Sequence, residues 1–153
     1  MITLLLKKLD GTIESKVVDL KYKVSENFCA YEFLVNGDDN LDLACVSQYD
    51  IDTLQYMRTL YGLSIMPTSA GRTPKYNIKI GGSTESNHAH IFDVNDFIIN
   101  SATNIQLDNV FNFLKLREYT GIGRYKGGRF HIDRGYRDKI TVWDKRWYNE
   151  RHI

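Results

Sequence analysis

The sequence predicts an α+β fold with a small, mainly antiparallel sheet and two principal helices packed on one side of it. Two segments, residues 50–61 and 104–119, carry apolar residues at helical spacing. Several shorter segments alternate or are briefly apolar, as strands do. The chain has 153 residues, of which 42% are hydrophobic. We therefore expect one domain, residues 1–153, that is large enough to bury a core.

The first 24 residues are predicted to form a hairpin. An apolar opening segment ends at Asp10-Gly11, a dipeptide typical of tight hairpin turns. Loosely alternating apolar residues follow it: Ile13, Val17, Val18, Leu20, Tyr22 and Val24. Residues 25–35 then read as a capped entry into a short helical piece, which the polar residues 36–40 end.

The first predicted helix is recognised by its end signals and its apolar spacing, and the second by a stripe of apolar residues. In the first, Asp50 is the predicted N-cap and Gly62 the C-terminal stop. Its apolar residues recur at helical spacing: Ile51, Leu54, Met57 and Tyr61. The second presents one apolar stripe, which we assign to core packing and not to a cofactor: Leu107, Val110, Phe111 and Leu114.

Between the helices, a brief strand at residues 63–66 precedes a long stretch without periodicity. This stretch holds both prolines, an arginine and two histidines, and long loops in compact domains are usually functional or disordered. Residues 91–99 turn apolar and predict a strand at its end. The C-terminal segment, with two tryptophans, predicts a final strand and a cover over the edge of the core.

The segment at residues 121–137 is the most distinctive in the chain, with five of the eleven glycines. Glycine weakens a strand interior, so we expect glycine turns around a short strand, Arg129–Asp133. Alternation along that strand places His131 and Asp133 on one face, and the apolar Phe130 and Ile132 on the other. This pattern predicts a strand that lines a cleft.

Charge and composition argue against several partners. Twenty basic and nineteen acidic residues give a formal net charge of +1, which offers no electrostatic reason to expect nucleic acid. No apolar run approaches the length of a membrane span, so we expect no membrane insertion, and we expect a monomer. Apolar residues precede the first lysines, the reverse of a signal peptide, so we expect the chain to be made in the cytoplasm. Cys29 and Cys45 are expected to stay reduced.

Several polar residues stand out as a candidate site: Arg72, His88, Asp93, Asp96, His131 and Asp133. Two histidines and one carboxylate with an open fourth position are a common ligand set for catalytic zinc. An arginine that faces such a site can stabilise a developing oxyanion or hold a substrate carboxylate.

These residues lie in motifs that resemble the VanY-like zinc D-Ala-D-Ala carboxypeptidases, a family that includes phage and cell-wall L,D- or D,D-peptidases. The resemblance covers about residues 25–143. SAGRTPKYNIKIGG, residues 69–82, is similar to the arginine loop of the family, and Ser86-Asn87-His88 matches its Ser-x-His. GIGRYKGGRFHID matches the segment that carries the last zinc histidine. The resemblance implies a zinc cleft on the side of the sheet away from the helices, with His88 and His131 as ligands.

The resemblance also implies a function. A zinc metallopeptidase would hydrolyse a peptide bond in peptidoglycan stem peptides, and a phage lysis enzyme that acts on the cell wall is one such protein. Arg72 would help with the oxyanion or the substrate carboxylate. Asp133 is the candidate general base, or else a group that orients a ligand histidine. The glutamate that many relatives carry three residues before the last histidine is Gly128 here.

One position departs from the family pattern. The family places its carboxylate ligand seven residues after the first histidine, and that position is Asn95. Strand alternation puts Asp93 on the same face as Asn95 and Asp96 on the other, which favours Asp93 as the ligand. A one-residue bulge would favour Asp96 instead. If neither binds metal, the chain is a catalytically inactive binding or structural protein on the same fold.

Overall fold

The computed structural model describes residues 1–34, 42–71 and 92–147. In these ranges the strands are β1 (Ile2–Lys7), β2 (Ile13–Val18), β3 (Leu43–Ser47), β4 (Ser64–Ser69), β5 (Val94–Asn100), β6 (Gly121–Tyr125), β7 (Arg129–Asp133) and β8 (Thr141–Lys145). The helices are α1 (Gln48–Tyr61), α4 (Asn104–Lys115) and the short 3-10 helix η1 (Ala30–Phe33).

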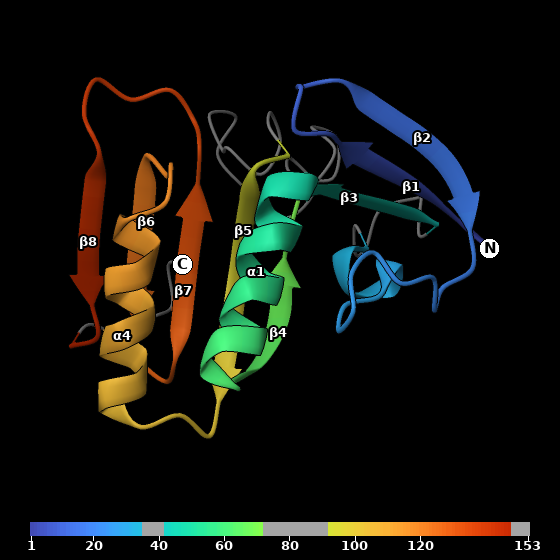
Figure 1. Ribbon diagram of the computed structural model, residues 1–153. Helices are drawn as coiled ribbons and strands as arrows, with labels where there is room; N and C mark the ends of the chain where they lie inside the picture. The colour runs from blue at the N-terminus through green and yellow to red at the C-terminus, as the bar shows by residue number, and fades with distance from the viewer. Residues whose placement is uncertain (35–41, 72–91, 148–153) are drawn as a thin grey trace.

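The strands form two sheets and not one (Figure 1). A three-stranded sheet has the order β2-β1-β3, in which β1 and β2 form the predicted antiparallel hairpin and β3 runs parallel to β1. A five-stranded sheet has the order β4-β5-β7-β6-β8, antiparallel except for the parallel pair β6 and β8. The α+β class is confirmed, and its larger sheet is mainly antiparallel.

Helices α1 and α4 both cover one face of the five-stranded sheet, as predicted (Figure 1). Below them, Phe97 and Phe130 stack with ring centroids 5.6 Å apart, and Phe111 of α4 lies 6.2 Å from Phe130. One hydrophobic cluster joins these residues to the first sheet through Leu4 of β1 and Phe28. Burial of this apolar surface provides the main driving force for the fold.

The helix ends correct two details of the sequence prediction. Ser47, and not Asp50, caps α1, because its side chain accepts a hydrogen bond from the Asp50 amide at 3.1 Å. Gly62 ends the helix in a left-handed conformation, as predicted. Helix α4 ends at Lys115 and not at Tyr119, which is buried beyond it. No helix in the described residues is long and apolar enough to span a bilayer.

The glycine-rich segment forms β6 and β7, and β7 has the predicted bounds. Gly127 and Gly128 make the turn between the strands, with φ of 75° and 78°. Gly121 and Gly123, however, lie inside β6, where turns were predicted. A side chain at Gly121 would strike the Asp133 carboxylate, and one at Gly123 would strike the Trp143 indole. These glycines are therefore explained by close approach from the neighbouring strands.

The turn offers a matched pair of variants. We expect Gly127→Ala to lower the free energy of unfolding by about 1 kcal/mol, because alanine is strained at positive φ but meets nothing there. Gly128→Ala should cost clearly more, at least about 2 kcal/mol, because its methyl group would also strike the Ile99 carbonyl oxygen. Urea unfolding of both variants measures the difference. Equal losses would show that the Ile99 contact is unimportant.

Candidate active site

His131 lies at the centre of the candidate site, on the face of the five-stranded sheet away from α1 and α4. It is opposite Asp96 in the antiparallel register of β5 and β7. Its Nδ1 is 2.7 Å from Asp96 Oδ1, and its Nε2 is 2.7 Å from Asp133 Oδ2. The imidazole is thus held between two carboxylates, with one bonded to each ring nitrogen.

Asp133 is fully buried and its oxygens are occupied. Besides His131, Oδ2 accepts a hydrogen bond from Arg137 Nη2 at 2.8 Å, and Oδ1 accepts one from the Gly135 amide at 3.0 Å. Burial alone would raise the pKa of this carboxyl, but the bonds from His131 and Arg137 hold the pKa far below its usual range. Asp133 is therefore a fixed anion that accepts hydrogen bonds.

This anion sets the protonation pattern of His131. Burial disfavours the imidazolium, but the bonds to Asp133 and Asp96 outweigh it and raise the pKa of His131 to about 9. The protonated imidazole donates to both carboxylates, from Nε2 to Asp133 and from Nδ1 to Asp96. Histidines that bind metals are usually held in this way, with the second nitrogen bonded to a carboxylate.

Trp143 of β8 forms one wall beside His131. The two ring centroids are 5.5 Å apart, and Trp143 Nε1 donates to the Tyr125 hydroxyl at 2.6 Å. The indole crosses β6 at Gly123, which has no side chain to block it. The sequence predicted this tryptophan only as a cover over the core, because its place beside His131 depends on the parallel pairing of β8 with β6.

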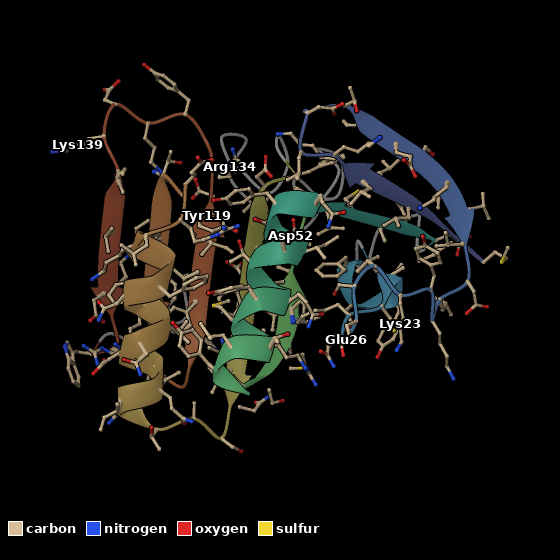
Figure 2. The ribbon with its side chains drawn as sticks, in the orientation of Figure 1. Lys23, Glu26, Asp52, Tyr119, Arg134 and Lys139 are labelled. Carbon is tan, nitrogen blue, oxygen red and sulfur yellow. The ribbon has the colours of Figure 1, made fainter. Side chains whose placement is uncertain are left out.

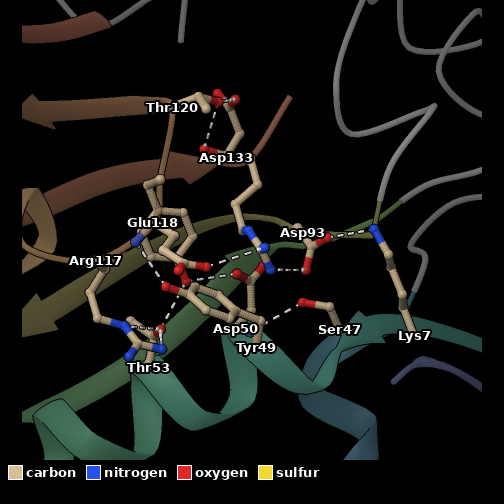
Figure 3. Close-up of polar contacts among 12 residues, drawn as sticks. Lys7, Ser47, Tyr49, Asp50, Thr53, Asp93, Arg117, Glu118, Thr120 and Asp133 are labelled. Atoms are coloured by element: carbon tan, nitrogen blue, oxygen red, sulfur yellow. Dashed lines mark hydrogen bonds and ion pairs between the residues drawn. The ribbon is translucent and has the colours of Figure 1, made fainter. Parts of the chain in front are cut away.

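Asp93, the favoured acidic ligand, does not lie beside His131. Its Oδ2 is 2.6 Å from Lys7 Nζ, and its Oδ1 is 3.7 Å from Arg134 Nη1 (Figure 3). The predicted alternation of β5 is correct, since Asn95 and Asp96 face opposite sides, but the side that meets His131 is that of Asp96. No bulge is needed, because β5 and β7 pair without a break.

Asn95 faces α1 and belongs to a buried polar cluster. Its Nδ2 is 2.5 Å from Asp50 Oδ2, and the Tyr119 hydroxyl donates to Asp50 Oδ1 at 2.8 Å. Arg134 and Tyr119 reach the same region, near the start of α1 (Figure 2). Burial raises the pKa of Asp50 to about 7. The position that departs from the family pattern therefore has a structural contact here.

The donor types at His131 and Asp96 fit a zinc ion. An imidazole nitrogen and a carboxylate oxygen are both ligands that zinc prefers, and here they are adjacent. Within the described ranges, no group of three or more His, Cys, Asp or Glu residues is arranged to hold a metal. The predicted ligand His88 and the predicted catalytic Arg72 both lie outside the described residues.

The family model described as Peptidase M15 matches residues 23–133. This span covers more than half of the chain and includes α1, β5 and β7, with Asp96 and His131. Among curated proteins, no relative matches the chain.

The raised pKa of Asp50 predicts a pH dependence of stability. The unfolded chain loses this proton near pH 3.8 and the folded chain only near pH 7, so the free energy of unfolding falls as pH rises between these values. The loss is on the order of 4 kcal/mol. Asp50→Asn should remove this contribution. The exposed Asp52 of the same helix provides the control variant, Asp52→Asn, which should keep it.

Urea unfolding measured at about pH 5 and about pH 7.5 tests this expectation. A slope that is as steep in Asp50→Asn as in the unmodified protein would assign the pH dependence to other groups.

Restoring the family's carboxylate at Asn95 should harm the protein. Asn95→Asp places a second buried carboxylate against Asp50, and we expect a loss of stability on the order of 3 kcal/mol. Asn100→Asp, at the exposed end of β5, is the control and should change little. Urea unfolding measures both. A stable Asn95→Asp protein with tighter zinc binding would show that Asn95 faces the metal site.

Proposed function

We propose that this chain, which belongs to the peptidase M15 family, is a zinc-dependent peptidase that hydrolyses a peptide bond in the stem peptides of peptidoglycan. The observation that carries the proposal is the arrangement of His131, with Nδ1 against Asp96 and Nε2 against the buried Asp133. A histidine oriented in this way beside a second carboxylate is typical of a metal ligand with its supporting anion.

The proposed zinc ligands are His131, Asp96 and His88. The first two are adjacent through the register of β5 and β7, and the third is proposed from the Ser-x-His motif. Asp96 thus takes the place that the sequence favoured for Asp93. When bound, zinc would supply a Lewis acid that acidifies water and polarises the scissile carbonyl.

Asp133 is proposed to orient His131 and not to act as the general base. Its carboxylate is buried and bonded to His131, Arg137 and the Gly135 amide, so it can neither reach a substrate nor accept a proton readily. These contacts support the second of the two roles that the sequence suggested, that of a group that orients a ligand histidine. Arg72 is proposed, from its motif alone, to bind the oxyanion or the substrate carboxylate.

The alternative, a catalytically inactive protein on the same fold, rested on the absence of a carboxylate at Asn95. That argument is weaker in the structure, because Asn95 faces α1 while Asp96 supplies a carboxylate beside His131. With an active site, the partner is a stem peptide and the place of action is the cell wall, as for a phage lysis enzyme.

Zinc binding distinguishes Asp96 from Asp93 as the acidic ligand. We expect Asp96→Asn and His131→Ala to lower the zinc affinity by at least about 100-fold, because each removes a ligand. Asp133→Asn should lower it by about 10- to 100-fold, as loss of a supporting partner does. Asp93→Asn, which loses only its ion pairs with Lys7 and Arg134, is the control and should bind normally.

Calorimetric titration measures the zinc affinity of each variant, and release of fragments from purified peptidoglycan measures its peptidase activity. Loss of binding in Asp93→Asn alone would return the ligand role to Asp93. An absence of zinc binding in the unmodified protein would favour the inactive alternative.

A further inference from the structure

The end of β6 and the start of α4 lie at the same end of the five-stranded sheet (Figure 1). A pocket of about 460 Å³ is lined by residues from both of these segments. Its walls include Leu107 of α4, Arg124 and Lys126 of the β6–β7 hairpin, and Arg146 and Trp147 after β8. None of Asp96, His131 and Asp133 lines it. It is therefore a separate feature from the candidate active site.

Arg124 is the unusual residue of this pocket. It points to the helix side of β6 and its side chain is only 2% exposed. One nitrogen, Nη1, is 2.5 Å from Asp108 Oδ1, but Nε and Nη2 have no hydrogen-bond partner in the described part of the chain. A guanidinium is always charged, and buried donors without partners destabilise a fold. An anion in the pocket would supply the missing acceptors.

The neighbouring groups make the pocket suitable for an anion. Arg146 is held by Asp144 through Nε and Nη2, and its Nη1 lies 4.0 Å from the Asp108 carboxylate that Arg124 also binds. Lys126 adds a third cation on the hairpin. Three cations face two carboxylates, so one positive charge is left over. Arginine pairs of this kind recognise carboxylate and phosphate groups.

Trp147 adds a flat apolar surface at the same place. Trp147 is 82% exposed, and the central guanidinium carbon of Arg146 lies 5.1 Å from the centre of its ring. An exposed tryptophan next to a charged pocket can stack on a ring of the ligand, while the cations fix the charged group. The two features together define a ligand with a ring and an oxyanion.

We propose that this pocket binds an anionic sugar unit, with its carboxylate or phosphate at Arg124, Lys126 and Arg146 and its ring against Trp147. Acidic cell-wall polymers carry such units as uronic acids or as sugar phosphates. This choice of source rests on the proposed function, whereas the binding site itself does not. On a wall-degrading peptidase, the pocket would hold the enzyme on its polymeric substrate.

Three sugars with one ring test the ligand chemistry. Glucose, glucuronate and glucose 6-phosphate are titrated into the metal-free protein at low ionic strength, with chemical shifts followed by NMR. We expect binding of glucuronate, of glucose 6-phosphate or of both, and no binding of glucose. The stronger of the two identifies carboxylate or phosphate as the preferred group. If neither binds, the proposal is wrong.

Variants test the location. Lys126→Gln and Arg146→Gln should each weaken binding of the anionic sugar by about tenfold. Trp147→Ala should weaken it as well, and these three residues are on the rim, so folding is expected to persist. Arg124→Gln should abolish binding, with its fold checked by circular dichroism.

Two controls make the result specific. Lys139→Gln removes an exposed cation elsewhere (Figure 2), and His131→Ala removes the candidate active site. Both should bind the sugar normally. Equal weakening in Lys139→Gln would mean unspecific charge attraction and would overturn the proposal. Sugar binding without any peptidase activity would count against the proposed function alone.

Discussion

The antiparallel register of β5 and β7 is the constraint on which the candidate site depends. Because Asp96 is paired with His131, the two side chains emerge together on the face away from the helices. The same register turns Asn95 and Ile132 toward the helices, where both are buried. A slip of one residue would exchange the two faces and place an amide where the carboxylate is now. The chemistry of the site is therefore decided by backbone pairing.

The buried cluster under α1 helps to hold that register. Asn95 can bond to Asp50 only if β5 presents this residue to the helix, and Tyr119 fixes the other oxygen of Asp50 from beyond α4. Apolar packing would tolerate small shifts, whereas hydrogen bonds between buried groups require defined positions. The cluster contains the buried carboxyl group of Asp50, whose pKa burial raises to about 7. It also connects α1 with β5, the strand that carries Asp96.

Single-sequence patterns were sufficient for local features of this fold and insufficient for contacts across strands. The alternation of Arg129–Asp133 predicted both the strand and the face of His131, because these depend only on neighbouring residues. The choice between Asp93 and Asp96 required the pairing partner of β5, which alternation alone does not contain. Likewise, Asp50 looked like a helix cap, since its partners Asn95 and Tyr119 are at least 45 residues away. Of the predicted site, Arg72 and His88 are outside the described residues, so their part stays a prediction.

The glycines of β6 leave space for the groups around the candidate site. Glycine inside a strand costs stability, because it gives up side-chain packing and conformational entropy. Here the space left at Gly121 holds the contact between Asp133 and Arg137, and the space at Gly123 holds the indole of Trp143. Both features lie beside His131: Asp133, which is paired with Arg137, bonds to its Nε2, and the Trp143 indole lies next to its ring. A strand optimised for its own stability would fill these two positions, so Gly121 and Gly123 indicate that β6 leaves room for the groups around His131.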